Sequence, residues 1–135
     1  MNKQIFIIGL LLSSSVLLPA QESGIARGEE VWTKAEKHRD SSEYMHAINL
    51  SKEALGIFLY HIGEEDSLIS VIYNCIGDDH YELDSFHIAL EFYQKSLEIR
   101  RCVLGEDHYR VGSIYWDLAW LYEKLDQDSL AIESF

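Results

Sequence analysis

A spacing of 42 residues recurs along the chain and restricts its fold more than any other feature. Three sets of positions share this spacing: the segments Gly63–Asp66 and Gly105–His108, the alanines Ala47, Ala89 and Ala131, and the small residues Ala35, Gly77 and Ala119. A period of roughly 20 to 50 residues is typical of repeat architectures, in which each unit buries its apolar face against its neighbours. We therefore expect a stack of similar units.

Each unit is predicted to contain two helices, because the chain has one proline and eight glycines and its apolar residues recur at helical spacing. The first expected pair is Ser23–Lys37 and Glu43–His61, joined by a turn at Arg39–Ser42, and the second pair is Ser67–Tyr81 and Ser85–Cys102. A further helix is expected to follow Asp107 and run to Leu125, and a last helix to start near Asp128. The predicted N-caps are Asp66, Asp84, Asp107 and Asp128, and the predicted helix stops are Gly63 and Gly105. The fold class predicted is all-α.

The first twenty residues have the pattern of a secretory signal peptide. Lys3 precedes an apolar run over Ile5–Leu18 that is interrupted by serines, and Pro19 and Ala20 follow it. The run is too short for a comfortable membrane span. We expect residues 1–20 to direct export to the bacterial periplasm, envelope or medium, with cleavage after Ala20, so that residues 21–135 form the repeat array with no stable membrane span.

Charge and motif content exclude several classes of function. A formal net charge of −12 opposes binding to nucleic acid and to anionic membranes, since both select clusters of Lys and Arg. No motif for a nucleophile, a zinc hydrolase or a phosphate-binding loop occurs. The acidic segment Asp78–Asp84, which contains His80, lacks a defined ligand spacing. We expect no catalysis, no metal and no cofactor.

The small and aromatic residues within a unit resemble the tetratricopeptide repeat pattern W-x2-L-G-x2-Y…A-x3-F. The last unit places Tyr115, Leu118, Ala119, Tyr122, Ala131 and Phe135 at these spacings, and the unit before it places Tyr73, Ile76, Gly77, His80, Ala89 and Tyr93 there. The segment GEDHYRVGSIYWDLAWLY, residues 105–122, is similar to the 42-residue repeats of kinesin light chains. A period of 42 also suits helical arrays of the HEAT type, but the small and aromatic positions favour tetratricopeptide repeats.

The resemblance implies a right-handed superhelix of antiparallel helix pairs that is incomplete at its C-terminus, with units at about 24–61, 66–102 and 108–135, the last truncated. It also implies that the first helices line a concave groove, where the candidates for peptide binding are Trp32, Glu36, Asn74, Asp78, Trp116 and Trp120. The residues expected to hold the units together are Ala35, Ala47, Tyr73, Gly77, Ala89, Tyr93, Tyr115, Leu118, Ala119, Tyr122 and Ala131.

Two functions remain open at this point. The first is an exported scaffold that binds a protein or a peptide with apolar and basic side chains, and that self-associates through its open C-terminal end. The second is the amino-terminal sensory or scaffolding region of a larger signalling enzyme, such as a histidine kinase or a protease. A transmembrane helix and kinase motifs encoded after Phe135 would favour the second function, and a stop codon there the first.

Overall fold

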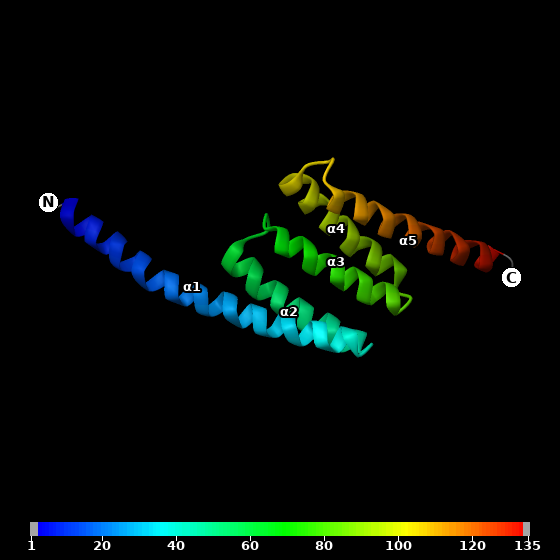
Figure 1. The fold of residues 1–135 in the computed structure, drawn as a ribbon, viewed down its shortest axis with the longest axis horizontal. Coiled ribbons are helices and arrows are strands. Elements are labelled where there is room, and N and C mark those ends of the chain that lie inside the picture. Colours follow the sequence, from blue (N-terminus) through cyan, green and yellow to red (C-terminus); the bar gives the residue numbers. More distant parts are fainter. Residues whose placement is uncertain (1–2, 134–135) are drawn as a thin grey trace.

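The computed structural model describes residues 3–133, and within them the side chains of residues 19–126; over this range it contains five helices and no strand (Figure 1). The helices are α1 (Lys3–Asp40), α2 (Tyr44–Ile62), α3 (Ser67–Glu82), α4 (Phe86–Leu104) and α5 (Tyr109–Glu133). Each helix packs against the one that follows it, and the contacts are most extensive within the pairs α1–α2 and α3–α4. The predicted all-α solenoid of helix pairs is confirmed.

The turns between the helices repeat with the same period as the sequence. Gly63 and Gly105 follow α2 and α4 with φ angles of 83° and 86°, so the two predicted helix stops are confirmed. Ser42 and Asp84 hold the turns within the pairs, with φ angles of 59° and 56°. Turns that recur 42 residues apart bring successive units into the same orientation.

The predicted N-caps have mixed outcomes. Asp66 caps α3, since its carboxylate accepts the amide hydrogen of Leu68 at 2.8 Å. Asp84 is wrong as a cap, because it takes the left-handed turn conformation and leaves the N-cap position to Ser85. Asp107 is also wrong, because Nδ1 of His108 accepts the amide of Arg110 at 3.1 Å. Asp128 lies within α5, outside the residues whose side chains are described.

Two predicted helix boundaries differ from the structure. The first helix begins at Lys3 instead of near Ser23 and continues through Pro19, because residues 20–23 contain no glycine or proline that would end it. The separate last helix near Asp128 is absent, because α5 continues to Glu133. A turn at Asp126 would place a non-glycine residue in the left-handed region at a cost of about 1–2 kcal/mol, a cost that the turns at Ser42 and Asp84 also carry within their helix pairs. Within the described residues, no helix is long and apolar enough to cross a membrane.

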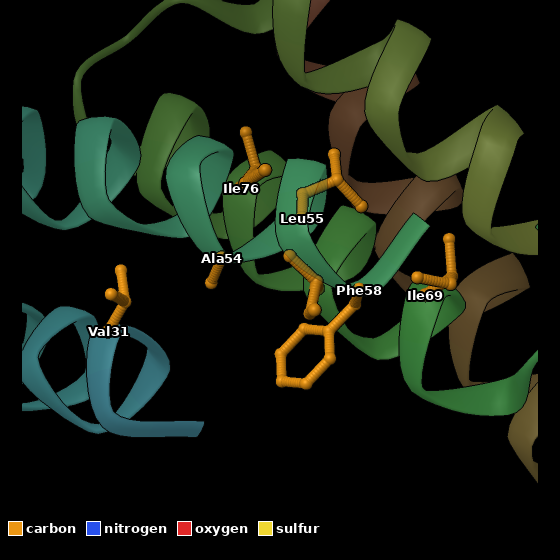
Figure 2. Packing of buried hydrophobic residues seen from close by; sticks show 7 residues of the cluster. Val31, Ala54, Leu55, Phe58, Ile69 and Ile76 are labelled. Atoms are coloured by element: carbon orange, nitrogen blue, oxygen red, sulfur yellow. The ribbon is translucent and has the colours of Figure 1, made fainter. Parts of the chain in front are cut away.

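The hydrophobic core is divided between two clusters. The first joins α1, α2 and α3 through Val31, Ala54, Leu55, Phe58, Ile69, Ile72 and Ile76 (Figure 2). The second joins α4 to α5 through Ala89, Tyr93, Ile114, Leu118 and Leu121. Since α3 and α4 belong to one pair, the core runs from unit to unit without closing on itself, as expected for a solenoid.

The small residues of the repeat set the distance between paired helices. Ala35, Ala47 and Ala89 are fully buried, and Gly77 is buried as well. A Cβ atom added to Gly77 would lie 2.7 Å from two ring carbons of Tyr93 and 3.5 Å from the carbonyl oxygen of Ala89. The α3–α4 pair therefore leaves no room for a side chain at position 77.

We predict that Gly77→Ala destabilises the protein by roughly 1–3 kcal/mol, because Tyr93 is buried and cannot move away without disturbing the core. The matched control is Gly56→Ala in α2, where an added Cβ meets nothing within 4 Å. That substitution should stabilise by about 0.5–1 kcal/mol through helix propensity. Urea unfolding followed by circular dichroism measures both. Equal effects of the two substitutions would contradict the packing argument.

Candidate functional site

The six predicted groove residues all lie on the first helices of the units, α1, α3 and α5. Trp32 is half-buried against the first core cluster, and the Arg39 guanidinium lies 5.4 Å from its ring centroid. Glu36 is exposed one turn further along α1. Trp116 and Trp120 are 70% and 55% exposed on α5, although tryptophan usually buries most of its surface. The two exposed tryptophans are thus available to a ligand.

A pocket of about 230 Å³ lies where α3, α4 and α5 meet. It is lined by Asp78, Tyr81, Glu82, Tyr93, Asp117 and Trp120. The structure thus brings Asp78 and Trp120 together, while Trp32 and Trp116 lie outside the lining. Sequence reasoning had assigned Tyr93 only to repeat packing and had not selected Tyr81, Glu82 or Asp117. The available signal for Asp117 was its position three residues before Trp120, on the same side of a helix.

Asp78 is held on the floor of this pocket by two hydrogen bonds. The Tyr93 hydroxyl donates to its carboxylate at 2.8 Å, and the Asn74 amide donates at 3.1 Å. Burial raises the pKa of Asp78, and the hydrogen bonds from Tyr93 and Asn74 oppose that rise. The side-chain carbonyl oxygen of Asn74 is buried and has no hydrogen-bond partner.

Asp117 faces the same pocket from α5, and its pKa is raised to about 6. Burial is the main cause, the negative charge of Asp78 adds to it, and Arg100 acts in the opposite direction. Two carboxyl groups near one another in a partly dry site favour any positive charge placed between them. The pocket is therefore suited to a basic side chain beside an aromatic wall.

A buried ion pair fixes α1 against α3 behind the groove. Arg39 donates to both carboxylate oxygens of Asp79, at 2.7 and 2.8 Å, and also to the Ser51 hydroxyl at 3.2 Å. The Asp79 side chain is 1% exposed. A bidentate contact of this kind sets the orientation of the two helices as well as neutralising the charge. Arg39 is thereby occupied and leaves the groove acidic.

The residues predicted to hold the units together differ in burial from one unit to the next. Six of them are buried (Ala35, Ala47, Gly77, Ala89, Tyr93 and Leu118), and Tyr73 is half-buried. In the third unit Leu118 is buried, whereas Ala119 is exposed and Tyr115 and Tyr122 are 47% and 51% exposed. The reason is that α5 continues as one helix, so no second helix covers that face within the described residues. The side chain of Ala131 lies outside the described residues.

A stack of antiparallel helix pairs, with the first helices forming an open row, defines a helical-repeat protein of the kind that presents an extended surface. The Tetratricopeptide repeat family matches residues 68–135, which is half of the chain, and the chain belongs to this family. Tetratricopeptide repeats indicate a scaffold for protein–protein interaction.

The chain is similar to the protein KINESIN LIGHT CHAIN-RELATED 3 of Arabidopsis thaliana, with 31% identity over 87 residues. The aligned region covers 64% of this chain and 12% of that relative. The chain therefore corresponds to a small part of the relative's length.

We predict that Asp117→Asn increases stability at pH 8 by about 1 kcal/mol, a value reduced to allow for solvent screening of this half-buried group. The raised pKa means that the folded state holds the proton more tightly than the unfolded state. The wild-type protein therefore loses stability as the pH rises from about 4 through about 6. The amide removes this loss, so the two proteins should converge near pH 4. Urea unfolding of both proteins between pH 4 and pH 8 tests this prediction. A difference in unfolding free energy that does not change with pH would contradict the electrostatic cause.

Proposed function

We propose that the chain binds an extended protein segment along α1, α3 and α5, with a basic side chain in the pocket between Asp78 and Asp117. The single observation that carries this proposal is the raised pKa of Asp117 in a pocket walled by Trp120 and Tyr93. A bound Lys or Arg would supply the counter-charge that the two carboxyl groups lack. It would also place its aliphatic stem against the tryptophan ring.

Apolar side chains of the same segment would contact the exposed tryptophans. Trp116 and Trp120 are four residues apart and therefore lie on one side of α5. Tryptophan is enriched among the residues that dominate binding energy at interfaces. An acidic chain with a net charge of −12 also attracts basic segments at long range.

The proposal includes export, which rests on the pattern of residues 1–20 alone. In that case the ligand is a protein of the periplasm, the envelope or the medium. The alternative is that the same groove serves as the sensory or scaffolding part of a larger signalling enzyme. Both versions require the groove to bind protein and assign no chemistry to these residues.

We predict that random 12-residue peptides selected on the immobilised protein by phage display are enriched in Arg or Lys next to Leu, Phe or Trp. Asp117→Asn should weaken binding of the best synthetic peptide roughly tenfold, because one charge of the pair is lost. The matched control is Glu91→Gln, which makes the same charge change on the exposed face of α4. Fluorescence anisotropy measures the affinities. Enrichment of acidic peptides, or equal weakening by the two substitutions, would contradict the proposal.

A second candidate function, self-association, is favoured by the uncovered face of α5. This face consists of Gly112, Tyr115, Ala119 and Tyr122, and all four residues are exposed. Their counterparts 42 residues earlier are Ser70, Tyr73, Gly77 and His80, of which Ser70, Gly77 and His80 are buried within the α3–α4 pair. An apolar helix face with a small residue at its centre fits a helix of a second copy at close range.

We predict that the protein forms dimers at about 100 μM in sedimentation-velocity experiments, and that the double substitution Tyr115→Lys and Tyr122→Lys returns it to a monomer, because it places like charges on both copies. The matched control is Tyr60→Lys, a substitution of a tyrosine that is 85% exposed on α2. Dimers that survive the double substitution would exclude this face.

A further inference from the structure

A group of metal-ligating side chains lies at the turn between α1 and α2, away from the groove pocket. Nδ1 of His38 lies 2.5 Å from a carboxylate oxygen of Glu43, and Nδ1 of His46 lies 3.9 Å from the same oxygen. The candidate ligand atoms of the three residues all lie within 4.8 Å of one another. The His38 and His46 rings are 5.5 Å apart at their centroids.

The backbone of the turn holds these three residues together. The amide of Glu43 donates to the carbonyl oxygen of His38 at 2.9 Å, and the amide of Ser42 donates to that of Arg39 at 2.9 Å. His38 lies in the last turn of α1, and His46 lies in the first turn of α2. The ligands are thus brought together by a short, hydrogen-bonded turn, and a bound ion would link two helices.

The second helix pair provides an internal comparison, because its turn has the same frame without the ligands. The amide of Ser85 donates to the carbonyl oxygen of His80 at 2.9 Å, as Glu43 does to His38. Position 88, the counterpart of His46, is isoleucine, and the His80 ring is buried and stacked on Phe92. The counterparts of Glu43 and His46 are Ser85 and Ile88, so the turn conformation does not require glutamate or histidine at those two positions, whereas a histidine stands at the position of His38 in both turns.

We propose that His38, Glu43 and His46 bind one divalent transition-metal ion of the zinc class. Ligands at about 2.0–2.2 Å from a tetrahedral zinc ion lie about 3.3 Å from one another. The present distances of 2.5 Å and 3.9 Å lie on either side of that value. Rotation of exposed side chains closes the difference, since the His46 side chain is 73% exposed and that of Glu43 51%. Water would complete the coordination.

The chemistry of the three ligands selects among cations. Imidazole suits zinc, nickel and copper, whereas magnesium and calcium require a set of oxygen ligands that this turn does not provide. Among nearby basic residues, Lys34 is paired with Glu30 at 2.7 Å, and Lys37 lines the same concavity as His38 and Glu43. Glu43 supplies the negative charge at the site. The ion would link α1 to α2 and stabilise the first unit of the array.

The test is isothermal titration calorimetry, in which the full chain at pH 7.5 is titrated with ZnCl2 and, in separate experiments, with NiCl2, MgCl2 and CaCl2. We expect one zinc ion per chain, nickel binding at the same site, no heat from magnesium or calcium, and a higher melting temperature with zinc. His46→Ala and His38→Ala should each weaken zinc binding at least tenfold. The matched control is His87→Ala, an exposed histidine in the first turn of α4, which should change nothing.

Circular dichroism of each variant without metal shows whether folding is retained, and His46 is exposed enough that its loss should not disturb the helices. Should His38→Ala fail to fold, His46→Ala and Glu43→Gln carry the test. The proposal is overturned if the wild-type protein does not bind zinc. It is also overturned by binding that His46→Ala leaves intact, because the ion would then lie elsewhere, for example at Cys102.

Discussion

The close approach of two helices at small residues is the constraint on which the rest of the structure depends. Ala35 and Ala47 in the first pair, and Gly77 and Ala89 in the second, are buried at the crossing of each pair. At Gly77 the gap is so narrow that a methyl group would overlap the Tyr93 ring. That ring in turn places its hydroxyl on Asp78 at 2.8 Å. The packing rule of the repeat thus positions the acidic floor of the groove directly.

Polar contacts between side chains of the first helices determine which charged groups face the groove. Arg39 could have neutralised it, but its guanidinium is committed to Asp79 and Ser51. Asp78 and Asp117 line the same pocket, and the pKa of Asp117 is raised mainly by its burial, with a further contribution from the negative charge of Asp78. Groups with perturbed pKa values often mark functional sites, and this perturbation is the reason that the proposed ligand carries a basic side chain.

The sequence was sufficient for the fold where periodicity and packing agree. The 42-residue spacing predicted the three helices α2, α3 and α4 closely, along with both glycine stops, because each of those helices has neighbours on its apolar side. It was insufficient for α5, where a turn at Asp126 would depend on packing against a further helix, and for the start of α1. Asp78 and Trp120 were among the predicted groove residues, whereas Asp117 was not, because its pKa is raised mainly by burial, which spacing along the sequence does not reveal. The zinc-class ligands were missed because their spacing reflects a turn conformation.

The uneven burial of the three units explains why the proposed binding features lie toward α5. The helices α1 to α4 form two closed pairs, while α5 packs mainly against α4 and leaves one face uncovered. A ligand that contacts Asp78 on α3 and both Asp117 and Trp120 on α5 would link two helices that do not follow one another in the chain. Ligand binding would therefore also hold the third unit against the second. In this way α5 would gain stability from the partner that it helps to bind.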